Sequence, residues 1–274
     1  MKIAMTLIVK NEEDIIEENI KFHSNQGIDY FLVIDNGSTD QTYEILKKLS
    51  KNYNIQLSQY FGKFEQKKLT TQLTKKAKKL FNPKWIINND ADEFWVSKNY
   101  KSIKESLSKI DGSVLWARRY NMIMYEGIKN YKESIYKVVN PIDYKIKPTP
   151  NKVFGKLVRK IIINPKGYIK TNSGNHSAEH FIFWQKKDYE DITVYHYPIR
   201  SFEQLKKHIK DRVQALKSGV PMGGHIEHWL KLKTEEDFQK EWEKYYFNNC
   251  EINCLRKLQI IEKDTKMKEL FQKI

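Results

Sequence analysis

Residues 85–95 read Trp-Ile-Ile-Asn-Asn-Asp-Ala-Asp-Glu-Phe-Trp, an apolar stretch that turns abruptly acidic where a buried strand is expected to end. Asp90 and Asp92 spell Asp-x-Asp, and in an extended segment residues i and i+2 point to the same side. Both carboxylates therefore aim beyond the carboxyl end of the strand, where open α/β sheets bind ligands. Two like charges side by side repel unless a cation lies between them, so the pair predicts Mg²⁺ or Mn²⁺ held together with a substrate diphosphate. A simple acidic turn is the alternative, although a solvated turn does not need apolar walls on both sides.

Strands and helices alternate in the part of the chain that leads up to these acids. Buried strands are predicted at residues 3–9, 30–34, 55–60 and 85–89. Helices are predicted to begin after Asn11, near Asp40 and at residue 64, with Asn11 as the N-cap of the first. This alternation predicts an α/β fold, with a parallel sheet and helices on both of its faces.

The second half of the chain shows a weaker pattern until residue 201. Residues 128–170 are punctuated by Pro and Gly and predict short strands or loops. From Ser201 the chain is predicted to be helical, because its apolar residues recur at the spacing of one helix face. We therefore expect a catalytic domain at residues 1–200 and a helical C-terminal extension at 201–274, packed on the active site or covering it. Cys250 and Cys254 lie one helical turn apart, which suits two partly buried thiols better than a disulfide.

The formal net charge of +15 is compatible with a nucleic-acid partner. However, only six of the 49 basic residues are arginine, the side chain best suited to bidentate recognition of phosphate and guanine. A basic surface also favours anionic substrates or an anionic membrane face. No apolar run approaches the roughly 18 residues of a membrane-spanning helix, and the N-terminus does not read as a signal peptide. We therefore expect a cytoplasmic protein without a nucleic-acid partner.

Three motifs stand at predicted strand ends, in the order Thr6-Leu-Ile-Val-Lys-Asn-Glu12, Val33-Ile-Asp-Asn-Gly-Ser-Thr-Asp-Gln-Thr42 and Asn89-Asp-Ala-Asp-Glu-Phe94. Together they resemble family 2 glycosyltransferases of the GT-A fold, which has a mixed, mainly parallel sheet flanked by helices. The resemblance covers roughly the first 120 residues well and residues 174–218 recognisably.

The resemblance implies roles for several of these residues. Thr6, Lys10 and Glu12 are expected to contact the nucleotide-sugar donor. Asp35, at the tip of its strand, is expected to accept hydrogen bonds from the nucleobase or ribose, and Gly37 lets the backbone approach the ligand closely. In the family the first aspartate of Asp-x-Asp lies near the ribose and the last binds the metal. These roles are carried to Asp90 and Asp92, both counted as candidate metal ligands, with Asp92 also counted as catalytic.

Residues 194–204 read Val-Tyr-His-Tyr-Pro-Ile-Arg-Ser-Phe-Glu-Gln and form a second constellation. Resemblance to bacterial members with a His-Tyr/Phe-Pro-x-Arg-Ser pattern implies that His196 completes the metal shell with Asp92. Arg200, just before a helix start, is then expected to bind the diphosphate, where a cation and a helix N-terminus both stabilise negative charge. The alternatives are a structural histidine and an arginine in a salt bridge beside the helix.

The general base is not identified by any motif. His176, in Gly174-Asn-His-Ser177, orients the acceptor, acts as the base or is a loop histidine bonded to backbone. Glu179 and Asp191 are further candidates in the same part of the chain, as is Glu126. Glu93 is expected to support the metal loop.

Two other functions compete with the transferase. A sugar-nucleotide pyrophosphorylase normally has a Gly-rich loop after its first strand, where this chain has Lys-Asn-Glu-Glu. A nucleic-acid-binding protein leaves Asp35, Asp90 and Asp92 unexplained, since clustered acids repel a phosphate backbone. The resemblance therefore implies an inverting, metal-dependent transferase that moves a hexosyl or hexosaminyl group from a UDP-linked nucleotide-sugar, and we expect a cell-surface glycan or glycolipid as its acceptor. Candidate acceptors are lipopolysaccharide, lipooligosaccharide and capsule precursors, reached by peripheral contact with the anionic inner membrane.

Overall fold

The computed structural model describes residues 1–62, 65–142, 152–155, 157–181, 186–219 and 224–274. These residues fall into two compact units, each made of segments that are separate in sequence. Unit 1 comprises Met1–Arg119 and Val158–Tyr195, and unit 2 comprises Tyr120–Leu157 and His196–Ile274. The expected division between residues 1–200 and 201–274 stays a prediction.

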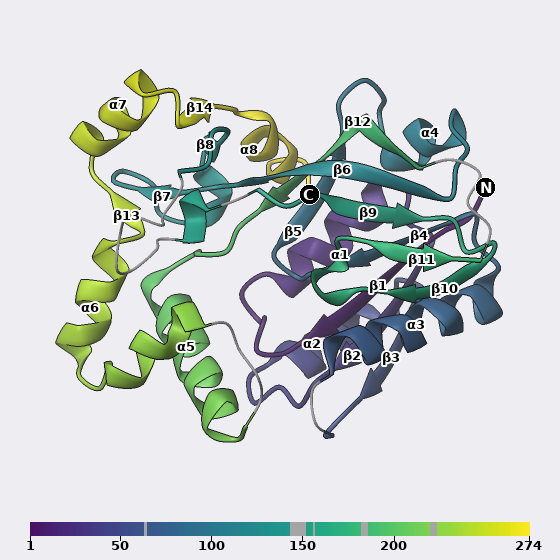
Figure 1. The fold of residues 1–274 in the computed structure, drawn as a ribbon, viewed down its shortest axis with the longest axis horizontal. Coiled ribbons are helices and arrows are strands. Elements are labelled where there is room, and N and C mark those ends of the chain that lie inside the picture. Colours follow the sequence, from purple (N-terminus) through teal and green to yellow (C-terminus); the bar gives the residue numbers. More distant parts are fainter. Residues whose placement is uncertain (63–64, 143–151, 156, 182–185, 220–223) are drawn as a thin grey trace. The chain divides into compact units, whose positions relative to one another are not determined.

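Unit 1 holds most of the central sheet (Figure 1). Its elements are β1 (Ile3–Val9), α1 (Ile16–Asn25), β2 (Tyr30–Asp35), α2 (Thr42–Leu49), β3 (Ile55–Gln59), α3 (Gln66–Phe81), β4 (Trp85–Asn89), β5 (Glu93–Ser97), α4 (Ile103–Ser108), β6 (Val114–Asn121), β9 (Lys160–Ile163), β10 (Tyr168–Thr171), a 3₁₀ turn at Ser173–Asn175, β11 (Ala178–His180) and β12 (Lys186–His196). The last residues of β6 and β12 belong to unit 2.

The eight-stranded sheet has the order β3-β2-β1-β4-β9-β6-β12-β5. The pairs β1–β2, β1–β4 and β2–β3 are parallel, as the alternating sequence predicted. β9 lies antiparallel between β4 and β6, which makes the sheet mixed. The predicted α/β architecture of the GT-A kind is confirmed.

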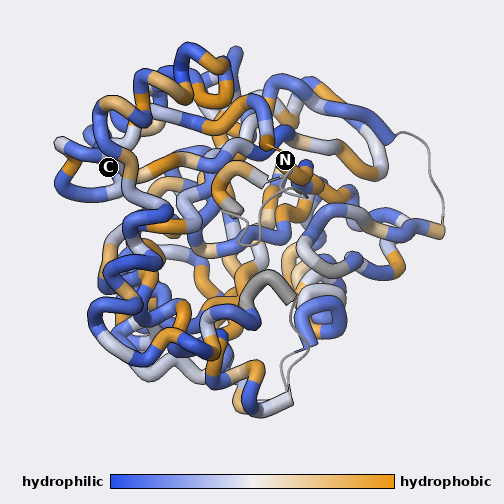
Figure 2. Tube along the Cα trace, turned by 60° about the vertical axis from the view of Figure 1, so that its left-hand side comes forward, coloured by the Kyte–Doolittle hydropathy of each residue, from blue (hydrophilic) through white to orange (hydrophobic). Residues whose placement is uncertain are grey.

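Helices cover the parallel part of the sheet. On one face, Leu73 and Ala77 of α3 pack against Ala4, Leu32 and Ile86 of three neighbouring strands. α1 contacts α2 and β5. β1, β2 and β4 are almost entirely buried. In Figure 2 the coiled helical turns alternate between hydrophobic and hydrophilic residues. This is the pattern of strands buried on both faces beneath amphipathic helices.

The strands at the sheet centre begin and end where the sequence predicted. β1 and β4 have the predicted bounds, and α3 runs from Gln66 instead of residue 64, which lies outside the described residues. The prediction of Asn11 as a helix N-cap is wrong, since α1 begins at Ile16. Asn11 has a left-handed φ of 56°, and its side chain accepts a hydrogen bond from the Thr39 amide at 2.8 Å. The loop after β1 is therefore tied to the loop after β2 before any helix begins.

Unit 2 contains α5 (Phe202–Lys217), α6 (Glu235–Glu243), α7 (Asn249–Lys257), α8 (Lys266–Phe271), β7 (Met124–Tyr125), β8 (Tyr136–Val138), β13 (Tyr246–Phe247), β14 (Ile261–Lys263) and 3₁₀ turns at Tyr131–Glu133, Lys152–Phe154 and Gly224–Lys231. The predicted helix start at Ser201 is confirmed, because its side chain caps α5 by accepting from the Gln204 amide. Capping boxes begin α6 and α7. Cys250 and Cys254 are free, as predicted, but both are exposed. Among the described helices, none has the length and apolar composition to cross a bilayer.

Candidate functional site

The Asp-x-Asp turn leaves the carboxyl end of β4 and returns at once as β5. Asn19 of α1 holds this turn from below, since its side-chain amide donates to the carbonyl oxygens of Ala91 at 2.7 Å and Glu93 at 3.0 Å. Asn89, the last residue of β4, donates to Asn19 Oδ1 at 3.2 Å. Both asparagines are buried. The backbone that carries Asp90 and Asp92 is therefore fixed by side chains from the helix packed beneath it.

A buried charge network surrounds Asp90 (Figure 1 shows β4, β6 and β9 side by side). Lys160 Nζ lies 2.6 Å from Asp90 Oδ2 and 3.0 Å from Glu93 Oε1. Arg119 Nη1 lies 3.2 Å from the same Glu93 oxygen. Burial lowers the pKa of Lys160, but Asp90 and Glu93 outweigh it and hold the pKa above its ordinary value. The ammonium group is therefore charged at neutral pH.

The donor loops predicted from β1 and β2 lie side by side. Asp35 is fully buried at the end of β2 and accepts from the Ser38 amide, at 3.2 Å through Oδ2. The Glu12 amide donates to Thr42 Oγ1 at 2.8 Å. Lys10 is exposed and Glu12 is half-buried. In the sheet order β2-β1-β4 these two loops and the Asp-x-Asp turn are neighbours, since the three strands are parallel and end at one edge.

Thr6 lies beneath this edge. It is buried, and its hydroxyl donates to Asn88 Oδ1 at 2.6 Å. Thr74 of α3 donates to the same oxygen, and Asn88 in turn donates to Thr171. This buried polar network joins β1, β4, α3 and β10. The donor contact predicted for Thr6 stays a prediction.

His176 lies close to the charge network. Its Nδ1 is 2.8 Å from the carbonyl oxygen of Arg159, the residue before Lys160. Burial, followed by the positive charges of Lys160 and Arg119, lowers the pKa of His176. Gly174 has a left-handed φ of 74°, and a Cβ there would lie 2.6 Å from His176 Nε2. Glycine therefore makes room for the imidazole ring.

The other two candidate bases lie in different surroundings. Glu179 is on β11 and pairs with Lys170 at 3.0 Å across the β10–β11 hairpin. Asp191 is buried and accepts from Ser97 Oγ at 2.7 Å, the Asn99 amide at 2.9 Å and the Ser106 hydroxyl. Burial raises the pKa of Asp191, but these hydrogen bonds prevail and lower it. Asp191 thus meets the far end of β5, about 13 Å along the strand from Glu93 at 3.3 Å per residue.

The second constellation belongs to unit 2. His196 Nδ1 lies 2.7 Å from Asn121 Oδ1. Arg200 is buried, and its Nη1 donates to the Tyr197 carbonyl oxygen at 3.2 Å. Glu126 accepts from the side chain of Asn249 at 3.1 Å. The metal and diphosphate roles of His196 and Arg200 stay predictions.

Asp90 and Asp92 are the carboxylates predicted to bind the metal. Across the part of the chain that the structure describes, no group of three or more His, Cys, Asp and Glu side chains is arranged to hold an ion. Mg²⁺ is commonly bound by one or two carboxylates together with waters and substrate phosphates. Two aspartates at a sheet edge fit that kind of site, in which the diphosphate completes the shell.

Sequence reasoning missed Asn19, Arg119 and Lys160. Lys160 opens the strand Lys-Ile-Ile-Ile, and a single cation ahead of an isoleucine run was the one available signal. The isoleucine run predicts a buried strand but does not predict that this strand, β9, pairs with β4. Asn19 is one polar residue on the inner face of an amphipathic helix, which is a signal of a buried hydrogen bond but not of its partner.

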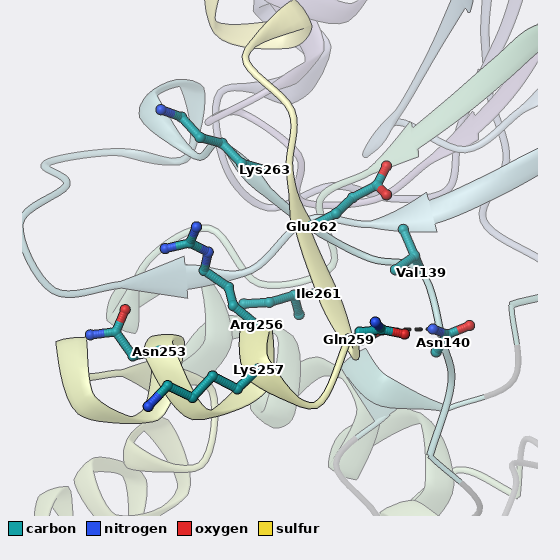
Figure 3. Close-up of a pocket in the computed structure, with 9 residues that line it drawn as sticks. All are labelled: Val139, Asn140, Asn253, Arg256, Lys257, Gln259, Ile261, Glu262 and Lys263. Atoms are coloured by element: carbon teal, nitrogen blue, oxygen red, sulfur yellow. Dashed lines mark hydrogen bonds between the residues drawn. The ribbon is translucent and has the colours of Figure 1, made fainter.

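A cavity of about 790 Å³ lies in unit 2, among β8, α7 and β14 (Figure 3). Its lining residues are Val139, Asn140, Asn253, Arg256, Lys257, Gln259, Ile261, Glu262 and Lys263. Its one acid, Glu262, is engaged by Lys137 at 2.8 Å. Cations and amides suit an anionic or hydroxyl-rich ligand, but none of the residues predicted from sequence lines this cavity.

A family model described as Glycosyl transferase family 2 matches residues 6–156. That range contains the loops after β1 and β2 and the Asp-x-Asp turn. No curated protein matches the sequence.

Several solved structures match part of the chain. TarS 1–349 of S. aureus in complex with UDP-GlcNAc is 14% identical, with 84% of this chain and 70% of that chain covered and a TM-score of 0.45. The complex of TarS 1–349 with UDP is 16% identical, with 88% and 78% covered and a TM-score of 0.45. HddC from Yersinia pseudotuberculosis is 12% identical, with 72% and 95% covered and a TM-score of 0.39. At these identities and TM-scores the matches carry no inference about this chain.

Proposed function

We propose that this chain, which belongs to glycosyl transferase family 2, is an inverting, metal-dependent enzyme that transfers a hexosyl or hexosaminyl group from a UDP-linked donor. The observation that carries the proposal is the edge formed by the ends of β2, β1 and β4. It places the buried Asp35, the Lys10–Glu12 loop and the Asp-x-Asp turn in consecutive positions. This is the edge at which open α/β sheets bind nucleotides.

In this proposal the donor lies across the three strand ends. Asp35 accepts hydrogen bonds from the uracil or the ribose, and Asp90 faces the ribose. A divalent ion, held by Asp90 and Asp92, would neutralise the diphosphate as it leaves. The motif that contains Arg200 supports this residue as a further ligand of the diphosphate in the proposal. Acids and cations fixed before the reaction cost no reorganisation when charge develops on the leaving group.

Inversion requires one direct displacement. The acceptor hydroxyl oxygen attacks the anomeric carbon while the bond from that carbon to the diphosphate oxygen breaks, and a base takes the hydroxyl proton. Three observations support His176 as this base: it lies near Lys160 and Asp90, its lowered pKa keeps it neutral, and Nδ1–H donation to Arg159 leaves Nε2 able to accept. Glu179 and Asp191 remain the other candidates: one oxygen of Glu179 pairs with Lys170, and both oxygens of Asp191 accept hydrogen bonds.

We also propose a cell-surface glycan or glycolipid as acceptor, reached at the inner face of an anionic membrane. The net charge of +15 supports the membrane contact, because several exposed lysines of α3 add to a basic surface. Contact of this kind is peripheral and weakens with salt.

The first test is calorimetric titration of the purified protein with UDP, with and without Mn²⁺. Metal-dependent binding of UDP is expected. GDP, CDP and dTDP titrated in the same way show whether uracil is the preferred base. If none of the four nucleotides binds with Mn²⁺ or Mg²⁺ present, the proposed function is wrong.

A further inference from the structure

The antiparallel strands β9 and β6 place two basic side chains at the sheet edge where the Asp-x-Asp turn lies. β9 runs antiparallel to β4, with Ile162 opposite Ile87, so the start of β9 meets the carboxyl end of β4. Lys160 is that first residue of β9. β6 is antiparallel to β9 and therefore brings Arg119, near its own carboxyl end, to the same edge.

The four charged groups form a neutral set. Lys160 is 1% exposed at its side chain and Glu93 is 0% exposed, while Asp90 remains 38% exposed. Asp90 and Glu93 contribute two negative charges, and Lys160 and Arg119 contribute two positive charges. The contacts at 2.6, 3.0 and 3.2 Å join all four in one network. One oxygen of Asp90 is thus already held by a protein cation, although the carboxylate is open to solvent.

A buried lysine needs a reason to be retained. Burial of an ammonium group is costly unless acids compensate it, and replacing a whole buried ion-pair set by well-packed apolar residues is often neutral or stabilising. Removing Lys160 alone would instead leave the buried Glu93 with only Arg119 beside it. Stability of the strand therefore does not by itself account for a lysine here. Its position against Asp90 points to a role at the site.

We propose that Lys160 is an internal counter-ion of the Asp-x-Asp motif, which holds Asp90 in place and suppresses metal binding before the nucleotide arrives. This inference rests on the proposed function. When no nucleotide is bound, the negative charge of Asp90 is already neutralised by Lys160, so a divalent ion is attracted only weakly. The nucleotide diphosphate supplies the further negative charge that the ion needs, so the ion and the nucleotide bind together. Lys160 acts here as a positioning residue, through Asp90.

The test is a titration of Mn²⁺ followed by electron paramagnetic resonance, which counts the free ion, in the absence and presence of UDP. Lys160→Met removes the positive charge and keeps the side-chain length, whereas Lys160→Arg keeps the charge. Lys109→Met, at an exposed lysine after α4, is the matched control. Lys160→Met/Glu93→Gln avoids leaving Glu93 without its nearest cation if the single variant fails to fold.

We expect Lys160→Met to bind Mn²⁺ without UDP about tenfold or more tightly than wild type, since one charge within a few ångströms shifts such equilibria by this much. The double variant frees Asp90 from its contacting cation but also loses the acid Glu93, so its Mn²⁺ affinity should rise by a smaller factor. Lys160→Arg and Lys109→Met are expected to match wild type. An unchanged nucleotide-free affinity in both Lys160→Met and the double variant overturns the inference, even where wild type binds Mn²⁺ with UDP. If wild type binds no Mn²⁺ even with UDP, the inference fails, and the titrations of the four nucleotides with Mn²⁺ and Mg²⁺ decide separately whether the proposed function fails too.

Discussion

The two ends of β5 hold acids in opposite ways. At its start, Glu93 faces Lys160 and Arg119, beside an aspartate that is 38% exposed. At its end, Ser97 and Asn99 donate to Asp191, which is buried and also accepts from Ser106 of α4. The acid at the first end is paired with cations, whereas the acid at the second end accepts hydrogen bonds from neutral donors.

This difference separates a site from a structural anchor. A carboxylate paired with a cation at a solvent-open edge can exchange that cation for another, because Coulomb attraction is not specific to one partner. A buried carboxylate saturated by hydroxyl and amide donors fixes the segments that supply them and has little room for a ligand. Asp191 ties β12 to β5 and α4, whereas Asp90 faces the edge at which the donor is proposed to bind.

The largest effect is expected at the first end of β5. Asp92→Asn should lower the rate of sugar transfer, or of donor hydrolysis, on the order of 10²- to 10³-fold, because it removes a preorganised charge at the leaving group. Release of UDP from a UDP-sugar measures this rate. Asp111→Asn, at an exposed acid of the same unit, is the control and should keep the wild-type rate. Equal rates for the two variants would remove Asp92 from the mechanism.

At the second end, Asp191→Ala should act on stability. We expect the free energy of unfolding to fall by about 3 kcal/mol, since three donors lose their acceptor in a buried place. Chemical denaturation measures this change, and UDP affinity measured below the transition should stay at the wild-type value. A stable Asp191→Ala protein that binds UDP but transfers no sugar would instead identify Asp191 as the general base.

The sequence predicts the acids near the start of β5 as a group, but not the surroundings of the acid near its end, because only the former depend on local signals. Asp90 and Asp92 follow an apolar strand within one short segment, so strand periodicity alone brings them together. The partners of Asp191 are far away in the chain: Ser97 and Ser106 precede it by 94 and 85 residues. A serine in the sequence gives no sign that it will face a carboxylate, so the sequence predicts Asp191 as a candidate base but not the hydrogen bonds that it accepts.

The same reasoning explains Lys160. Alternating strands and helices predicted the parallel strands β1 to β4 with nearly correct bounds, because each strand is a short apolar run within its own segment of chain. β1, β2 and β3 pair in chain order, and β4 pairs with β1 on the other side. β9 joins the sheet after a long excursion and runs the other way. Its register against β4 depends on tertiary packing of isoleucines, which pattern reasoning does not reach.

At the middle of β5, the Trp95 amide donates to a buried histidine, His23, whose protonation should make the free energy of unfolding depend on pH. His23 is fully buried, accepts from the Trp95 amide at 3.1 Å and bonds to the Asn19 carbonyl oxygen at 2.8 Å. Burial lowers the pKa of His23 to about 3. The folded state therefore stays neutral while the unfolded state protonates below about pH 6.5. The stability that neutral His23 contributes is therefore fully present above that pH. As the pH drops toward 3, protonation of the unfolded state lowers the folding equilibrium constant, by at most tenfold per pH unit.

Denaturant midpoints between pH 7 and pH 4 measure this dependence. His23→Gln keeps an acceptor and a donor without a titrating ring, so its midpoint should vary less steeply than that of wild type in this window. Parallel pH profiles for the two proteins would show that His23 does not stay neutral in the fold. Such a result would also mean that the hydrogen bonds of His23 and Asn19 hold α1 less firmly than their geometry indicates.

The smallest effect tests whether the second end of β5 is built as one structure. Ser102 caps α4 by accepting from the Glu105 amide, and α4 supplies Ser106 to Asp191. Ser102→Ala should lower the free energy of unfolding by about 1 kcal/mol. In the Asp191→Ala background the same change should cost less, because α4 no longer has an anchor to lose, and a double-mutant cycle measures the difference. Additive losses would mean that α4 is held by Ile103 and Leu107, which are both buried, without help from Asp191.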